Sequence, residues 1–296
     1  MRFSLNFLYK AIGCSKQSFH QYLDRQLKEL EESGYLEIII KQIRKKHPTM
    51  GLRYMYEMIK PEVMGRDKFI AYCKDLGLMQ KQKFKPIRTT DSSGVYRFPN
   101  RIADLKIVKV NQVWSSDITY YQIGDEVYFI TFIIDNYSRL IVGWSVSEGL
   151  RTEETTLKAL AMAVKHRRGI DLGGLIFHSD GGGQYYAKIF LKFTEKKGFI
   201  NSMCEYAYQN GKAERINGVI KNNYLRPWAC KSKAELIIKV DQACTNYNNE
   251  KPHKELKMLS PLNFEKKCLT LNQQTRPKVT ESFTAINSQT GHRAPL

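Results

Sequence analysis

Apolar residues along the chain change their period near residue 107. Upstream of this point they recur every third or fourth residue, as in amphipathic helices, whereas downstream they alternate or run continuously, as in strands. We therefore expect an α/β core over residues 107–268, preceded by an all-α region over residues 1–78. Residues 79–106 have no apolar period and interleave basic with aromatic side chains, which indicates a basic linker. The polar residues 269–296 are expected to form a loosely ordered tail.

The all-α region contains two candidate helix-turn-helix motifs. In the first, Gly13 separates two short helices within residues 5–24, and Ser15 can cap the second of them. A third helix is expected over residues 29–46, stopped by Pro48. Any helical hairpin has the same spacing, so a DNA-binding and a purely structural interpretation of the first motif both stay open.

The second candidate motif is better formed. Helices are predicted over residues 51–60 and 66–76, and Gly77 ends the second one. Arg66 and Lys68 lie where a recognition helix needs cations to meet DNA phosphates. The same two side chains would also suit an ordinary solvated helix face.

The core is predicted to be a mixed sheet with helices on both faces. Three strands with antiparallel connections come first, at residues 112–123, 127–134 and 140–146. A long helix capped by Thr152 follows. The elements then alternate as a strand at residues 175–180, a helix at 187–197, a strand at 199–204 and the helix that carries Glu214.

The chain is strongly basic, since 47 Lys and Arg stand against 29 Asp and Glu, for a formal net charge of +18. Residues 1–106 contribute 21 − 11 = +10 and the remainder 26 − 18 = +8, so the excess is spread over the whole length. A nucleic acid is the natural partner of such a chain, because each Lys or Arg placed on a phosphate releases counterions.

Other classes of protein fit the sequence poorly. No apolar run is long enough for a membrane span, and the start lacks the apolar segment of a secretory signal. Six cysteines are scattered without a Cys-x-x-Cys pair, which suggests neither a zinc site nor a disulfide framework. We therefore expect a cytoplasmic protein in a reducing compartment, associated with the nucleoid and not with a membrane.

Two strand-borne aspartates and one helix-borne glutamate form the candidate active site. Asp117 lies in the middle of the first predicted strand, Asp180 ends a neighbouring strand, and Glu214 lies on a helix whose opposite face is apolar. Carboxylate oxygens suit Mg²⁺ or Mn²⁺. Two such ions about 3.5–4 Å apart can activate an attacking oxygen and stabilise a leaving one in phosphoryl transfer. We expect Asp117 to bridge both ions, Asp180 to hold one and Glu214 the other.

Several polar residues around the triad are candidates for contacts with DNA. Lys221 follows Glu214 on the same helix face and could contact a phosphate. His178 lies on the same side of its strand as Asp180 and could orient the site, although a packed histidine is the commoner case. The full candidate set for DNA contact is Lys221, Arg215, Asn217, His178, Gln184, Lys68 and Arg66. Asp135 is left out, because hydrogen bonds to the backbone of its own turn explain it without chemistry.

Five ordered segments resemble a known family. They are WSSDIT (114–119), DNYSRLIVGW (135–144), HSDGGGQY (178–185), QNGKAERING (209–218) and YNNEKPH (247–253). Together they closely resemble the DDE transposases of bacterial insertion sequences, of the "insertion sequence three" kind, which share their core with retroviral integrases. Residues 48–53 and the helices after them also resemble the helical DNA-binding region that precedes this core. Asp180 and Glu214 are separated by only 33 residues, a shorter spacing than is usual in the family.

The resemblance implies a ribonuclease H-like fold and two Mg²⁺ or Mn²⁺ ions. It also implies an enzyme that cleaves DNA and joins it by strand transfer, as in DNA transposition and integration. It supports Asp117, Asp180 and Glu214 as the metal-binding triad and Lys221 as the basic residue after the glutamate. It further implies a homo-oligomer acting on paired element ends and on target DNA. Some relatives require fusion to the product of an upstream reading frame, which carries its own helix-turn-helix.

Two other functions remain open at this point. A ribonuclease H-like nuclease could use water as its sole nucleophile and only hydrolyse DNA. A catalytically silent protein could use the all-α region to bind DNA as a repressor. An intact triad argues against the silent protein, and two candidate DNA-binding motifs argue for an enzyme that holds specific ends.

Overall fold

The computed structural model describes residues 4–62, 64–79, 98–204, 207–272 and 275–277. The chain divides into two compact units, Met1–Gln82 and Lys83–Leu296. Most of the predicted basic linker and the end of the predicted tail therefore lie outside the described residues. No helix among the described residues is both long and apolar enough to span a membrane.

The first unit contains four helices within its described residues, α1 (Leu5–Ala11), α2 (Lys16–Lys46), α3 (Leu52–Ile59) and α4 (Arg66–Asp75). The break at Gly13 and the cap at Ser15 are as predicted, since Ser15 Oγ accepts a hydrogen bond from the Ser18 amide. The boundary expected between residues 24 and 29 is wrong. One unbroken helix runs from Lys16 to Lys46, because residues 16–46 contain no proline and Gly34 alone is tolerated.

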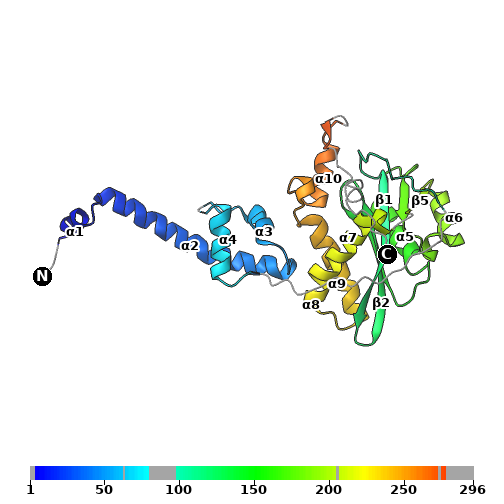
Figure 1. The fold of residues 1–296 in the computed structure, drawn as a ribbon, viewed down its shortest axis with the longest axis horizontal. Helices are drawn as coiled ribbons and strands as arrows, with labels where there is room; N and C mark the ends of the chain where they lie inside the picture. The colour runs from blue at the N-terminus through cyan, green and yellow to red at the C-terminus, as the bar shows by residue number, and fades with distance from the viewer. Residues whose placement is uncertain (1–3, 63, 80–97, 205–206, 273–274, 278–296) are drawn as a thin grey trace, which may run out of the picture. The chain divides into compact units, whose positions relative to one another are not determined.

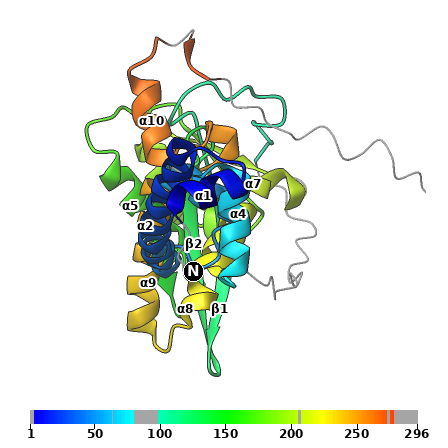
Figure 2. The same ribbon diagram turned by 90° about the vertical axis from the view of Figure 1, so that its left-hand side faces the viewer.

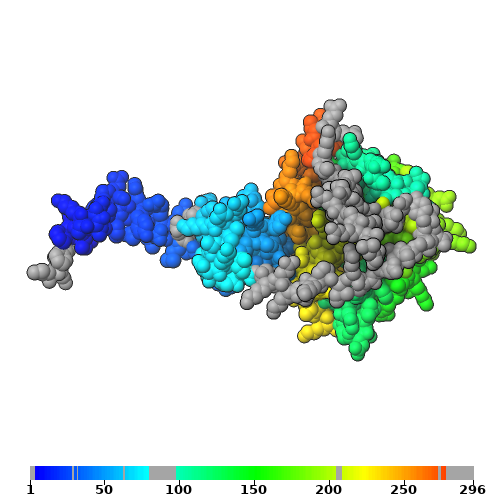
Figure 3. All heavy atoms as spheres, viewed as in Figure 1, coloured from blue at the N-terminus to red at the C-terminus, as the bar shows by residue number. Residues whose placement is uncertain are grey.

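The core of the first unit lies between the carboxyl-terminal half of α2 and the α3–α4 pair. Ile40, Met55, Phe69 and Cys73 are fully buried there. The guanidinium of Arg44 donates to the carbonyls of Pro48 and Met50 in the connection to α3 and to that of Leu78 beyond α4. The amino-terminal half of α2 stands clear of α3 and α4 (Figures 1 and 3).

The second unit is built on a five-stranded mixed sheet in the order β3-β2-β1-β4-β5. Its strands are β1 (Val113–Ile123), β2 (Glu126–Asp135), β3 (Ile141–Ser147), β4 (Ile176–Ser179) and β5 (Ile200–Met203). The first three pair antiparallel, while β4 is parallel to both β1 and β5. This order confirms the predicted ribonuclease H-like fold and places β1 at the centre of the sheet. The β1–β2 hairpin extends beyond the helices that cover the sheet (Figures 1 and 2).

Helices cover both faces of this sheet. They are α5 (Thr156–His166), α6 (Lys188–Lys196), α7 (Gly211–Ile220), α8 (Arg226–Trp228), α9 (Lys233–Asn249) and α10 (Pro261–Leu269). Short turns of other helix types are η1 (Gly183–Tyr185), η2 (Ala207–Asn210), the π-helical η3 (Lys221–Leu225) and η4 (Lys254–Leu256). One hydrophobic cluster joins the sheet to α7, η3 and α9, and a second joins its other face to α5 and α6. The two clusters are the two sides of the core.

The start of α5 differs from the prediction. Thr152 was expected to cap the helix, but the helix begins only at Thr156. The preceding residue Thr155 has a non-helical backbone (φ −105°, ψ −98°), and its hydroxyl donates to the Arg151 carbonyl. Residues 152–155 therefore form turns ahead of the helix. The sequence alone did not show whether Thr152 or Thr155 would directly precede the helix.

Candidate active site

Asp117 lies on β1, the central strand of the sheet, opposite Phe132 of β2. Its side chain is mostly buried and carries two short hydrogen bonds. Oδ1 accepts from the amide of Ile118 at 2.9 Å, and Oδ2 accepts from Nδ2 of Asn217 at 2.7 Å. Asn217 belongs to α7, so the second bond ties α7 to the middle of the sheet.

Asp180 directly follows β4, the strand parallel to β1 and next to it. In this parallel pairing Ser115 lies opposite His178, so Asp180, two residues further on, is level with Asp117. Its Oδ1 accepts a hydrogen bond of 3.0 Å from the amide of Gly182. A Cβ added at Gly182 would lie 3.0 Å from this oxygen and 3.1 Å from Oε1 of Gln184. Glycine therefore lets the loop fold closely around the carboxylate.

Glu214 lies in the first turn of α7, and its side chain is exposed. The opposite face of α7 is in the core, where Ile216 and Ile220 are 3% and 0% exposed, as the apolar stripe predicts. Burial raises the pKa of Asp117 to about 8, with the neighbouring carboxylates of Asp180 and Glu214 adding to the effect. Burial also raises the pKa of Asp180. Asp180 and Glu214 are therefore near enough to Asp117 for their charges to act on its carboxylate.

Lys221 begins the π-helical turn η3, seven residues after Glu214. Its Nζ donates to Oγ1 of Thr119 at 2.9 Å and lies 4.7 Å from the ring centre of Tyr120. Burial lowers its pKa, while the charge of Asp117 acts in the opposite direction. The ammonium group is therefore held beside β1, close to Asp117. π-helical turns are rare overall, and those that occur are often found at functional sites.

The other predicted DNA-contact residues lie in three different environments. His178 is fully buried, its Nδ1 is 3.0 Å from Oγ of Ser202, and burial lowers its pKa to about 4. A side chain without exposed surface cannot touch a DNA strand, so His178 packs below the site. Gln184 lies in the loop after Asp180, while Arg215 is 76% exposed on α7. Arg66 and Lys68 lie exposed on α4 in the other unit, where Arg66 pairs with Asp67 at 3.0 Å.

Two models of the family described as "Integrase core domain" match the chain, one over residues 108–208 and one over residues 201–261. Together they span all five sequence segments and the three carboxylates. The chain belongs to the integrase-core transposases of insertion sequences. It is an enzyme of DNA transposition and integration, as the resemblance implied.

Both curated sequences and solved structures include proteins that are similar to this chain. The transposase is 29% identical over 268 residues to the "Insertion element IS600 uncharacterized 31 kDa protein" of Shigella sonnei, covering 87% of this chain and 97% of that one. It is 26% identical over 259 residues to the "Transposase for insertion sequence element IS629" of Shigella sonnei, covering 86% of each. Among solved structures, the HTLV-2 integrase catalytic core domain in complex with magnesium aligns with a TM-score of 0.44 at 20% identity, over 53% of this chain and 98% of that one.

The donor set of the transposase fits a hard divalent cation. Among the described residues, neither Asp117 nor Asp180 forms a salt bridge, so their shared negative charge has no ion-pair partner there. In that same part of the chain, no three His, Cys, Asp or Glu side chains converge closely enough to hold one ion. Glu214 lines a depression on one face of α7, together with Gly211, Gly218 and Asn222 among others.

The buried hydrogen bonds next to the carboxylates were not predicted from the sequence. The side-chain amide of Asn210 donates to the carbonyl of Ser116 at 2.9 Å, and the Ser116 hydroxyl lies 3.0 Å from that of Tyr185. These side chains are buried and fix the strand that carries Asp117 against the loop that follows Asp180. Their only signal was proximity in sequence to the triad residues, because partners so distant along the chain leave no periodic pattern.

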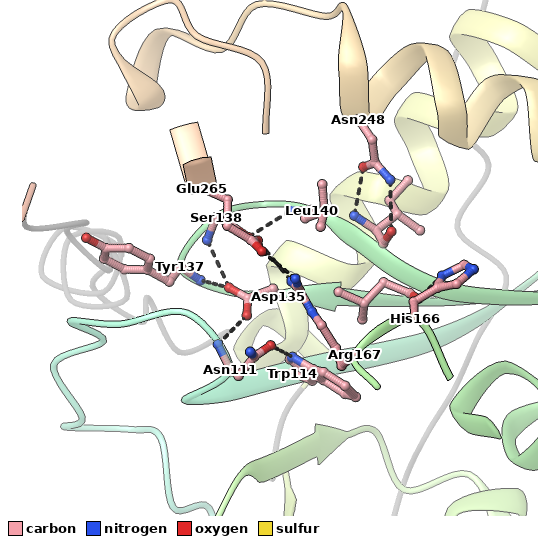
Figure 4. Close-up of polar contacts among 12 residues, drawn as sticks. Asn111, Trp114, Asp135, Tyr137, Ser138, Leu140, His166, Arg167, Asn248 and Glu265 are labelled. Carbon is pink, nitrogen blue, oxygen red and sulfur yellow. Dashed lines mark hydrogen bonds and ion pairs between the residues drawn. The ribbon is translucent and has the colours of Figure 1, made fainter. Parts of the chain in front are cut away.

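The turn around Asp135 is structural, as predicted. Its fully buried carboxylate accepts hydrogen bonds from the amides of Asn111, Tyr137 and Ser138 (Figure 4). Burial raises its pKa, and two of these backbone donors act against that rise. Every donor in this set comes from the backbone, so Asp135 organises the β2–β3 connection and takes no part in the site.

Proposed function

We propose that this transposase uses Asp117, Asp180 and Glu214 to hold two Mg²⁺ or Mn²⁺ ions and to cut and join DNA phosphodiesters. The observation that carries the proposal is the 2.7 Å hydrogen bond between Asn217 and Asp117, because it brings the first turn of α7 over the edge where the two aspartates meet. The raised pKa of Asp117 supports it, because its causes are burial first and then the nearby charges of Asp180 and Glu214, and a divalent cation would offset both.

The bound ions supply Lewis-acid stabilisation of the attacking and leaving oxygens. The chain itself orients the groups that bind them. Asn217 and the Ile118 amide hold the Asp117 carboxylate in one rotamer, and the Gly182 amide does so for Asp180. Lys221, placed beside Thr119, is close enough to Asp117 to bind a phosphate oxygen of the strand being cut.

The proposed substrate is DNA, both the element's ends and the target. The net charge of +18 supports binding to a polyanion. We assign contacts in the catalytic unit to Lys221, Arg215 and Gln184, and contacts through the first unit to Arg66 and Lys68 on α4. Action on paired ends as a homo-oligomer, and cooperation with an upstream-frame helix-turn-helix protein, belong to the same proposal.

A strand-transfer assay tests this function. Purified protein is incubated with labelled duplexes of the element's terminal sequence and with Mg²⁺ or Mn²⁺, beside the Asp180→Asn and Glu214→Gln variants. We expect joined products from the parent protein, none from either variant and none in EDTA. The matched control is Asp241→Asn, an exposed aspartate on α9 outside the site, assayed after a thermal-unfolding check of its fold.

The other outcomes contradict the proposal in different ways. Shortened fragments without joined products would indicate a nuclease that only hydrolyses. DNA that is bound but unchanged by the parent and both variants would indicate a binding protein, or a chain that is active only with an upstream partner. Equal activity of the parent and the Asp180→Asn variant would remove Asp180 from the site.

A further inference from the structure

Glu255 holds two arginines that come from distant parts of the catalytic unit. Oε2 of Glu255 lies 2.8 Å from Nη2 of Arg139, in the β2–β3 connection, and Oε1 lies 3.5 Å from Nη1 of Arg215, on α7. Glu255 itself is in η4 and half exposed. The two guanidinium groups therefore meet at one carboxylate on the surface beside the first turn of α7.

Arg139 is built into this position. Its backbone is left-handed, with φ of +63°, a conformation that costs a residue other than glycine free energy. Its amide donates to the Asp135 carbonyl at 2.8 Å, so the Asp135 turn fixes where its side chain starts. The side chain is only 12% exposed, and its buried Nε has no hydrogen-bond partner among the described residues. The turn thus places the guanidinium of Arg139 next to Glu255, and this one ion pair leaves the Nε donor without a hydrogen bond among the described residues.

Arg215 behaves differently from Arg139. Its side chain is 76% exposed, and its ion pair with Glu255 is long. An exposed pair of this kind contributes about 0–1 kcal/mol, so the guanidinium can turn to another anion at little cost. Positive charge is also in excess here. Lys212 lies one helical turn before Arg215 and bonds to the Asn136 carbonyl, and Lys254 is exposed beside Glu255.

The face of α7 that carries Glu214 and Arg215 is open to solvent. Gly211 and Gly218 lie on it, in a depression that Glu214, Arg215 and Asn222 also line. A Cβ added at Gly211 would meet nothing within 4 Å, and one at Gly218 would meet only the Asn222 side chain, at 4.0 Å. Packing within the described chain therefore requires neither glycine, although Gly218, inside the helix, weakens it by about 1 kcal/mol relative to alanine. Both leave the helix backbone open to a close approach from outside.

We propose that Arg139 and Arg215, held by Glu255, form a second phosphate-binding site for DNA, separate from the carboxylate site and joined to it by the glycine face of α7. A strand whose reacting phosphate lies at the proposed metal site crosses this face and places a further phosphodiester on Arg215. Arg139 supports that contact indirectly, because its ion pair occupies Oε2 of the Glu255 carboxylate. The inference rests on the proposed function, and it names where the DNA backbone runs beyond the reacting phosphate.

Binding without catalysis tests this site. Fluorescence anisotropy is measured in EDTA, on protein that carries Asp180→Asn, with a duplex of the element's terminal sequence and with a duplex of random sequence at several salt concentrations. Arg215→Gln should weaken binding and lower the slope of log K against log salt by about 1, the loss of one phosphate contact. Glu255→Gln should strengthen binding, because it frees the guanidinium groups for phosphate.

The chain offers a matched control for both changes. Lys233 and Glu148 form another exposed pair, at 2.7 Å, away from α7. Lys233→Gln and Glu148→Gln change the net charge by the same amount, and both should leave the salt slope within error. If Arg215→Gln behaves like Lys233→Gln, or if Glu255→Gln weakens binding in a protein that still unfolds at the parent temperature, the site is wrong.

The two duplexes distinguish the source of the phosphate. A loss confined to the terminal sequence places the element end on this site, and an equal loss on both duplexes places any DNA backbone there, target included. Either result supports a phosphate site. Because the assay needs neither metal nor chemistry, it can succeed while strand transfer fails, so the two proposals fail separately.

Discussion

The side-chain amide of Asn217 donates a 2.7 Å hydrogen bond to Oδ2 of Asp117, joining two residues that lie 100 positions apart in the chain. Asn217 is only 6% exposed. It was predicted to contact DNA, yet in the structure it holds a carboxylate of the site in place. We therefore assign it a positioning role, and the first prediction follows from that role.

Asn217→Ala should lower strand transfer roughly 10–100-fold, as is typical when a residue that orients a metal ligand is removed. The loss should be partly recovered at higher Mn²⁺ concentration, because a looser Asp117 binds the ion more weakly. Initial rates over a metal titration measure both effects. Asn249→Ala, at the exposed end of α9, is the control and should match the parent. A uniform loss that metal does not relieve would indicate a role other than orienting Asp117.

Arg167 and Glu265 form a buried two-point ion pair that joins α5 to α10 (Figure 4). Their side chains are 9% and 8% exposed. Arg167→Met alone should cost about 3–5 kcal/mol of unfolding free energy, because it leaves the Glu265 carboxylate buried without its partner. The double variant Arg167→Met with Glu265→Leu should recover most of that loss. Urea unfolding of the three proteins checks this, and additive losses would contradict it.

Gly143 lies on β3 against α5, where a Cβ would lie 2.3 Å from the Ala159 carbonyl oxygen and 2.9 Å from Cβ of Ala163. Both obstacles are backbone or rigid groups, so α5 must move away from the sheet. Gly143→Ala should therefore lower the unfolding free energy by about 1–3 kcal/mol or more. Gly149→Ala is matched, since its Cβ would meet nothing within 4 Å. It should stay within about 0.5 kcal/mol of the parent. Equal stability of the two variants would show that α5 can move away from the sheet without a cost in free energy.

His253 packs its ring against Tyr247 with ring centres 4.9 Å apart. Burial lowers its pKa from 6.5 to about 3, with help from the charges of Lys251 and Arg139. The folded state therefore binds the proton more weakly than the unfolded state, so the stability that His253 contributes is present above pH 6.5 and is lost as the pH falls toward 3.

The parent protein should accordingly lose stability between pH 6.5 and 4 more steeply than the His253→Phe variant, which keeps a packed ring but cannot take up a proton. The difference in slope should approach at most about 1.4 kcal/mol per pH unit. Urea unfolding at half-unit steps of pH measures both slopes. Parallel slopes would show that His253 does not control this part of the pH dependence.

The elements that carry the three carboxylates were largely predictable from the sequence, because the features that place these elements are local. Alternation located the strand of Asp117, and a short apolar run followed by three glycines located the end of the strand of Asp180. Four-residue spacing located the core face of the helix that carries Glu214. Periods of two and 3.6 residues arise from the backbone itself, so they can be seen in the sequence without knowledge of the fold.

Local signals failed where two of them competed. Thr152 was predicted to cap α5, but the helix begins after Thr155, whose hydroxyl donates to the Arg151 carbonyl and whose carbonyl accepts from the Ser145 hydroxyl of β3. The single helix α2 contains no proline, so the boundary expected within it had no residue to enforce it.

The contacts between distant residues were decided by the tertiary structure alone. Asn217 with Asp117, Arg167 with Glu265, and Arg139 with Arg215 through Glu255 each join segments far apart in the chain. Such pairs leave no period in one sequence, because each partner is chosen by where the sheet and its helices bring the backbone. The sequence by itself determined which elements carry the three carboxylates. The tertiary structure determined which side chains bond to them, and which two arginines meet at Glu255.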